Sequence, residues 1–118
     1  MNHLELGVKG EDLALHFLMN LGYRLKAKNY RFKHLELDLI FEKEQELIVV
    51  EVKTRSNAAS GEPYSFVTKS KQKQIIKATN HYIHEIDWHG ETRFDIVSIL
   101  YHHDLQKIEH IPHAFYPC

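Results

Sequence analysis

The chain has 118 residues, enough for one domain with a buried core and too few for two such domains. Its composition, 43% hydrophobic and 26% charged, is that of a soluble globular protein, and no apolar run approaches the ~20 residues that a membrane helix needs. The single cysteine, Cys118, excludes an internal disulfide framework and a cysteine-based zinc site. The first residues do not resemble a signal peptide, so we expect a cytoplasmic protein of one domain, residues 1–118, without membrane contact.

The formal net charge of −1 hides an uneven distribution of basic residues. Residues 24–33 carry basic charges and no acid, and residues 53–77 carry basic charges against Glu62 alone. A basic face on a nearly neutral body is the electrostatic footprint of phosphate contacts, and ordinary solvated surface charge is the alternative. The candidate nucleic-acid-binding residues in these segments are Arg31, Arg55, Lys71 and Lys73.

The first predicted element is a helix from about Glu5 to Leu21, because apolar residues recur there at helical spacing and Gly22 supplies the stop. Glu11 flanks the apolar stripe of this helix instead of pointing fully to water. Three strands follow the helix. Their predicted ranges are 23–30, 35–41 and 47–53.

The polar link at residues 43–46 predicts an antiparallel hairpin between the second and third strands, although it lacks the Gly or Asn of the favoured tight turns. Residues 55–66 are small and polar and predict a surface loop. A second helix from Lys69 to Ile86 and two further strands, 92–100 and 107–111, complete the order α-β-β-β-α-β-β. The predicted fold class is therefore α/β, with a mixed sheet flanked by helices.

The predicted hairpin brings acidic residues together. A turn symmetric about Glu44 and Gln45 pairs residues whose numbers sum to 89, so Asp38 lies opposite Glu51 and Glu36 lies opposite Lys53. The two-residue period of a strand places these four side chains on one face of the sheet. It makes the other face entirely apolar, with Leu37, Leu39, Phe41, Ile48, Val50 and Val52.

Two facing carboxylates repel each other unless a positive group lies between them. A hard divalent ion such as Mg²⁺ or Mn²⁺ takes oxygen ligands, and Asp38, Glu51 and the Val52 carbonyl could supply them. Lys53 could then position an attacking water or stabilise charge on a phosphate. The alternative is a solvated acidic face on which Lys53 only neutralises Glu36 across the ladder.

Other residues give weaker hypotheses. His81 and His84 are one helical turn apart, but zinc would need two further convergent ligands, so we do not predict a zinc site. Tyr64 and Phe66 could stack on unpaired bases, although docking of the loop onto the core is the simpler interpretation. The basic residues in the first half of the second helix oppose the helix dipole, which favours an anionic partner or a simple solvated face.

Several motifs in the same order resemble the YraN-type family of small bacterial proteins. These motifs are GxxGEDLA at 7–14, GYRLKAKNYR at 22–31, LELDLIF at 35–41, LIVVEVKTR at 47–55, VTKSKQ at 67–72, RFDIVSI at 93–99 and IEHIPHAF at 108–115. The family consists of predicted endonucleases distantly similar to archaeal Holliday-junction resolvases, within the restriction-endonuclease-like PD-(D/E)xK superfamily. Each motif is loose alone, and their order and spacing make the resemblance specific.

The resemblance implies that Asp38 and Glu51 are metal ligands and that Lys53 is the catalytic lysine. It adds Glu11 as a carboxylate that reaches the site from the first helix, and Lys71 as a phosphate contact. Glu36 matches a further acid of the family, although His34 and Leu35 stand where a glycine normally precedes that acid. Arg93 and Asp95 match the RFD signature, for which we expect a structural ion pair near the site.

The sequence thus predicts a metal-dependent endonuclease that uses Mg²⁺ or Mn²⁺ and acts on DNA, including branched or structured DNA. The resemblance also implies a homodimer, because paired cuts on opposed strands need two active sites. Two alternatives remain open: a non-catalytic nucleic-acid-binding module with the same fold, and an adaptor whose basic face binds an acidic protein.

Overall fold

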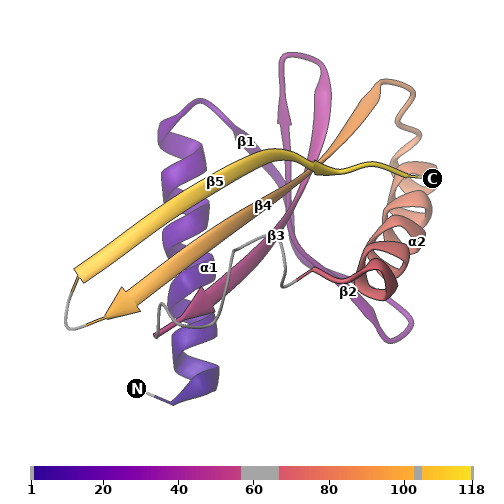
Figure 1. The fold of residues 1–118 in the computed structure, drawn as a ribbon. Coiled ribbons are helices and arrows are strands. Elements are labelled where there is room, and N and C mark those ends of the chain that lie inside the picture. Colours follow the sequence, from indigo (N-terminus) through magenta and orange to yellow (C-terminus); the bar gives the residue numbers. More distant parts are fainter. Residues whose placement is uncertain (1, 57–66, 103–104, 118) are drawn as a thin grey trace.

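The computed structural model describes residues 2–56, 67–102 and 105–117 (Figure 1). Most of the predicted loop at 55–66, with Tyr64 and Phe66, lies outside the described residues. The described elements are α1 (His3–Asn20), β1 (Arg24–Phe32), β2 (Leu35–Lys43), β3 (Glu46–Arg55), α2 (Lys69–Ile86), β4 (Glu91–His102) and β5 (Leu105–Phe115). The predicted order α-β-β-β-α-β-β is confirmed, and the predicted bounds of α2 match the structure at both ends.

The five strands form one mixed sheet in the order β1-β2-β3-β4-β5. Neighbouring strands are antiparallel except β3 and β4, which are parallel because α2 carries the chain back between them. A helix covers each face of the sheet: Ala14 and Leu18 of α1 pack on one face, and Ile75 and Ala78 of α2 pack on the other. Figure 1 shows the two helices flanking the twisted sheet. Within the described residues, no helix is long and apolar enough to cross a membrane.

The β2–β3 hairpin has the predicted register. Its paired residues run from Lys43 with Glu46 to Leu39 with Val50, and each pair sums to 89. The turn residues Glu44 and Gln45 have φ values of 52° and 66°. Positive φ at both positions is typical of the type I′ turn, whose twist matches the strands, so the hairpin adopts this geometry without the favoured glycine.

The ladder ends before it reaches the predicted acidic pair. Pairing stops at Leu39 and Val50, so Asp38 and Glu51 are not a ladder pair, and the predicted pairing of Glu36 with Lys53 is wrong for the same reason. The Asp38 carboxylate instead accepts a hydrogen bond from the Val52 backbone N–H, at 2.8 Å. The strands therefore separate at the point where the acids lie.

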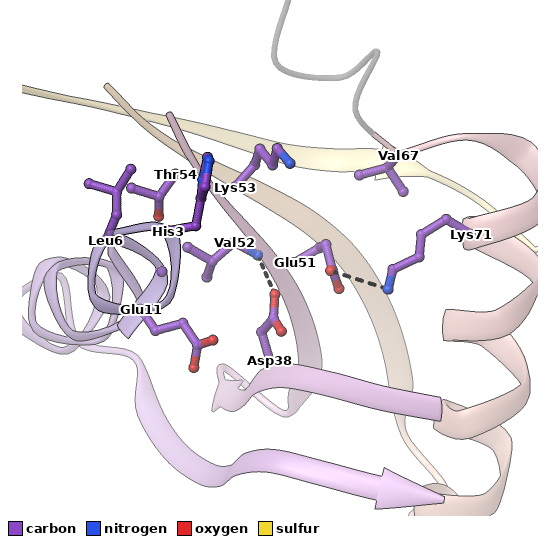
Figure 2. Close-up of a pocket in the computed structure, with 11 residues that line it drawn as sticks. His3, Leu6, Glu11, Asp38, Glu51, Val52, Lys53, Thr54, Val67 and Lys71 are labelled. Carbon is purple, nitrogen blue, oxygen red and sulfur yellow. Dashed lines mark hydrogen bonds and ion pairs between the residues drawn. The ribbon is translucent and has the colours of Figure 1, made fainter. Parts of the chain in front are cut away.

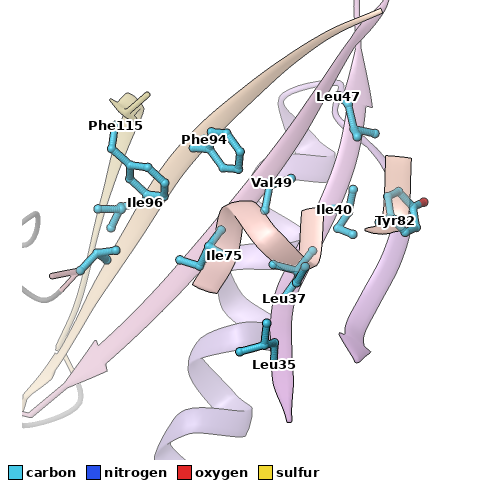
Figure 3. Packing of buried hydrophobic residues seen from close by; sticks show 12 residues of the cluster. Leu35, Leu37, Ile40, Leu47, Val49, Ile75, Tyr82, Phe94, Ile96 and Phe115 are labelled. Atoms are coloured by element: carbon cyan, nitrogen blue, oxygen red, sulfur yellow. The ribbon is translucent and has the colours of Figure 1, made fainter. Parts of the chain in front are cut away.

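The prediction of one wholly apolar face is also wrong. Leu35 and Leu37 pack with Ile40 and Val49 in the cluster under α2, as Figure 3 shows, whereas Leu39 packs in the cluster under α1. Side chains of a regular strand alternate between faces, so the alternation of β2 shifts by one residue at Asp38. The shift leaves Glu36 on the α1 side of the sheet, away from Glu51.

The close approach of α1 to β3 depends on a glycine. A Cβ placed on Gly10 would lie 1.7 Å from Thr54 Oγ1 and 2.8 Å from Thr54 Cβ, so only glycine fits there without movement of the helix. The contact fixes the height of α1 above the sheet. Glu11 is the next residue, and its position over the sheet follows from this contact.

Gly10→Ala is therefore expected to lower the free energy of unfolding by about 1–3 kcal/mol, because the added methyl overpacks the α1–β3 contact. Gly7→Ala is the matched control, since nothing lies within 4 Å of a Cβ at Gly7 in the same helix. The control should be neutral or gain up to about 1 kcal/mol through helix propensity. Urea denaturation of both variants measures the difference, and equal stability of the two would contradict the packing argument.

Candidate metal and phosphodiester site

A cavity of about 440 Å³ opens where β2 and β3 separate, between the N-terminal ends of α1 and α2. Figure 2 shows Glu11, Asp38 and Glu51 pointing into it from three different elements, with Lys71 reaching toward Glu51 from α2. The four predicted catalytic residues line this cavity: Glu11, Asp38, Glu51 and Lys53. Lys71, the predicted phosphate contact, and Val52, whose carbonyl is the predicted third ligand, line it too.

Asp38 is held by the backbone of β3. Its Oδ2 accepts the Val52 N–H at 2.8 Å, and its side chain lines the cavity beside Glu51. In an extended strand the N–H and C=O of one residue point to the same edge. The Val52 carbonyl is therefore directed to the edge of β3 that carries Asp38, as a third ligand would require.

Glu51 is an acid with one oxygen left unsatisfied. Its side chain is only 14% exposed, and its Oε1 lies 3.9 Å from Lys71 Nζ. Its Oε2 is buried and has no hydrogen-bond partner among the described residues. Ionising a buried carboxyl group whose oxygen has no partner is costly, and a bound cation would offset that cost.

The raised pKa values of the three acids also favour a bound cation. Burial and the neighbouring Asp38 carboxylate raise the pKa of Glu51 to about 9, against the lowering effect of Lys71. Burial also raises the pKa of Asp38, although the bond from Val52 N–H opposes the shift. Burial followed by the Asp38 and Glu36 charges raises the pKa of Glu11. The acids thus resist ionisation together until positive charge is added.

The pKa of Glu51 predicts how the metal-free protein responds to pH. A carboxyl group with a pKa of about 9 in the fold and 4.5 when unfolded binds more protons in the folded state, so stability falls as pH rises between those values. At pH 9 in EDTA, Glu51→Gln should be more stable than the parent by at least about 1 kcal/mol, or about 4–8 °C in Tm. The exposed Glu109→Gln is the control. Parallel pH profiles for parent and Glu51→Gln would contradict the assignment.

The donor set suits a hard divalent cation. It offers two carboxylates, of which Glu51 has a buried oxygen without a partner, and an adjacent backbone carbonyl. No three Asp, Glu, His or Cys side chains in the described ranges are grouped so as to enclose an ion by themselves. Mg²⁺ commonly binds through one or two carboxylates and completes its shell with water and substrate phosphate, which is the pattern that this site can offer.

The cations of the site differ from the sequence prediction. Lys71, expected only as a phosphate contact, is the residue whose ammonium lies nearest to Glu51 in the ion pairs described. Lys53 is exposed and lines the cavity, and Glu36 forms its ion pair with Arg31 at 2.9 Å instead of with Lys53. The cavity therefore holds two lysines beside its acids, one from β3 and one from α2.

The remaining predicted binding residues lie outside the cavity lining. Lys73 is exposed on α2, Arg55 is half-buried at the end of β3, and Arg31 is engaged with Glu36. Five lining residues were not predicted for the site from the sequence: His3, Leu6, Gly7, Thr54 and Val67. Thr54 could have been suspected, since it lies in the same strand as the acids, whereas His3 and Val67 reach the cavity only through the packing of the helices.

Arg93 and Asp95 form the ion pair expected for the RFD signature, but neither residue lines the cavity. Asp95 is fully buried and accepts from Arg93 Nε and Nη2, both at 2.8 Å, and contacts His110 Nε2 at 2.7 Å. Arg93 also bonds the Tyr23 hydroxyl and Glu46. The network ties β3, β5 and the residue before β1 to β4, and none of these residues lines the cavity.

The chain is similar to known proteins over nearly its whole length. Residues 10–99 match the model of a family described as "Uncharacterised protein family UPF0102". A UPF0102 protein of Christiangramia forsetii is 43% identical, with 97% of this chain and 96% of that protein covered. UPF0102 proteins of Flavobacterium psychrophilum and Bacteroides thetaiotaomicron are 42% and 39% identical, each with at least 95% of either chain covered. The resemblance to the YraN-type family is thereby confirmed, and the chain belongs to the UPF0102 family.

Proposed function

We propose that the protein is a metal-dependent endonuclease that hydrolyses phosphodiester bonds in DNA. The observation that carries the proposal is the convergence of Asp38 and Glu51, both largely buried and with raised pKa values, in an open cavity that also holds two lysines. Perturbed acids grouped in a cleft are typical of functional sites. The buried Glu51 Oε2, which has no hydrogen-bond partner among the described residues, supports the proposal, because a bound cation would offset the cost of ionising it while Lys71 lies 3.9 Å from the other oxygen.

In this proposal, different residues have different roles in the hydrolysis. Asp38, Glu51 and the Val52 carbonyl would hold Mg²⁺ or Mn²⁺, which when bound polarises a phosphoryl oxygen and lowers the pKa of a water. Lys53 lies at the rim of the cavity, where its ammonium can orient the attacking water or bind the charge that develops on phosphate. Glu11 faces Asp38 from α1 and adds negative charge that strengthens retention of the ion.

Lys71 and the start of α2 provide the phosphate contact. Thr68 caps the helix by accepting the Lys71 N–H at 3.2 Å, so this end of α2 lies at the cavity together with Val67 and Lys71. The positive end of a helix dipole and a lysine both favour an anionic ligand. Exposed Lys69 and Lys73 extend the basic surface along α2 beyond the cavity. The phosphate backbone of a polyanion such as DNA could lie along this surface.

A cleavage panel tests the proposal. Single-stranded, duplex and four-way-junction DNA are incubated with the protein in Mg²⁺, Mn²⁺ or EDTA, and products are resolved on denaturing gels. Cleavage that needs a divalent ion supports the proposal, and preference for the junction supports action on branched DNA. Salt-sensitive binding without turnover in either metal would establish a binding module instead, and no retention of DNA at low salt would leave the protein-binding adaptor.

A further inference from the structure

We propose that Asn29 is a positioning residue that holds Glu11 in the site and breaks the sheet at Asp38. The inference deepens the proposed function, on which it rests for the metal and the reaction. Asn29 lies in β1 and does not line the cavity itself, but its side chain contacts Glu11, which does. Two features of Asn29 carry the inference: its backbone conformation and the partners of its amide.

The backbone of Asn29 is left-handed in the middle of a strand. Its φ is 53°, whereas a regular antiparallel strand has φ near about −140°. The paired register runs from Lys28 with Leu39 directly to Tyr30 with Leu37, so Asn29 and Asp38 occupy the interrupted position between those pairs. Asparagine is one of the few residues other than glycine that tolerate this conformation.

The interruption coincides with the shift of side-chain alternation in β2. Leu37 packs under α2 and Leu39 packs under α1, and Asp38 lies between them, opposite Asn29 in the register. A residue that leaves the extended conformation locally bends and rotates the paired strands, as a β-bulge does. This rotation allows the Asp38 carboxylate to leave its regular position and bond the Val52 N–H of β3.

The side chain of Asn29 bridges two acids. When its amide is oriented with the nitrogen toward the two carboxylates, the orientation that their acceptor oxygens require, that nitrogen donates to Glu11 Oε1 at 2.9 Å and to Glu36 Oε1 at 3.2 Å. An amide nitrogen carries two hydrogens, so one Asn29 side chain satisfies both carboxylates. Glu36 is held in turn by Arg31 through its other oxygen, at 2.9 Å. Glu11 is thereby anchored from β1 at a position facing Asp38, although like charge would otherwise drive the two acids apart.

Two substitutions separate the roles of backbone and amide. Asn29→Gly keeps the left-handed backbone and removes the amide, whereas Asn29→Ala removes the amide and strains the backbone. Lys33→Gly is the matched control, because Lys33 also has a left-handed φ, 57°, but its described contact is with the Phe32 ring and not with a cavity residue. All variants are compared with the parent by Mn²⁺ titration calorimetry, thermal unfolding, and kcat and KM for cleavage.

We expect Asn29→Gly to melt close to the parent while its Mn²⁺ affinity or its kcat falls by about 10–100-fold, the usual effect of losing a partner of a metal-site carboxylate. The KM for DNA should be unchanged, because Asn29 does not line the cavity. Asn29→Ala should show the same loss together with a lower Tm, and Lys33→Gly should match the parent. Parent-like Mn²⁺ affinity and kcat in Asn29→Gly would overturn the proposal.

A double-mutant cycle tests the link itself without metal or turnover. Glu11→Ala, Asn29→Gly and the double variant are melted in EDTA, and the two single shifts in Tm are added and compared with the double variant. A bonded pair gives a non-additive shift, and additive shifts would overturn the Asn29–Glu11 link. Because this readout does not need cleavage, an inactive parent would count against the proposed nuclease function while the positioning role is still decided.

Discussion

Asp38→Asn should reduce the metal-dependent cleavage rate by about 10²–10⁴-fold, which is the scale of losing a group that acts directly on the charge of a transition state. The substitution removes one negative charge from the pair with Glu51 and keeps the shape of the side chain. Asparagine also retains an oxygen that can accept the Val52 N–H, so the local fold should persist. Initial rates in Mn²⁺ measure the loss, and thermal unfolding verifies the fold.

Asp12→Asn provides the control for this experiment. Asp12 lies beside Glu11 in α1, but its side chain is 60% exposed, pairs with His16 at 3.3 Å and does not line the cavity. Its substitution should leave cleavage within about twofold, since exposed ion pairs contribute little. If Asp38→Asn and Asp12→Asn cut DNA equally well, Asp38 does not hold the metal.

Arg93→Met is expected to be the most destabilising single substitution, at about 3–5 kcal/mol, because it removes the bidentate partner of a fully buried carboxylate. Burial raises the pKa of Asp95, but bonds from His110 and Arg93 outweigh it and hold the pKa below its usual value. The stabilising contribution of Asp95 is thus present at neutral pH and lost as pH falls. Urea denaturation at pH 7 measures the cost, and the variant should lose less on acidification than the parent does.

Arg24→Met is the matched control. Arg24 Nη2 lies 2.6 Å from Glu42 Oε1, but the arginine side chain is 68% exposed, so its substitution should cost less than about 1 kcal/mol. A similar cost for the two arginines would show that burial of the Asp95 network does not decide its contribution to stability.

Local patterns were sufficient to predict most of the fold. The lysine-rich segment from Lys69 to Ile86 has a clear helical stripe and a Thr68 cap, and its predicted ends are correct. The polar link around Glu44 determined the β2–β3 register by symmetry alone. Periodicity and turn position are properties of neighbouring residues, so a single sequence reveals them.

The site was harder to predict because its geometry arises between elements. The sequence places Asp38 and Glu51 in facing strands, but only the left-handed Asn29 in a third strand explains why the ladder ends before them. Lys71 lies near Glu51 because α2 packs against the sheet. The sequence between β3 and α2 does not predict where α2 packs. For Asp95, the partner Arg93 lies two residues away in the same strand, whereas His110 comes from β5 and no local pattern connects it to Asp95.

The interruption at Asn29 has a second consequence, for association between molecules. The sheet is open, so β1 is an edge strand whose outer backbone groups could template another chain. β1 is irregular between Leu25 and Ala27 and again at Asn29, and basic side chains project along it. A neighbouring strand would meet the register shift after Leu25, the left-handed backbone of Asn29 and concentrated positive charge. The conformation that shapes the acidic site therefore also protects this edge against aggregation.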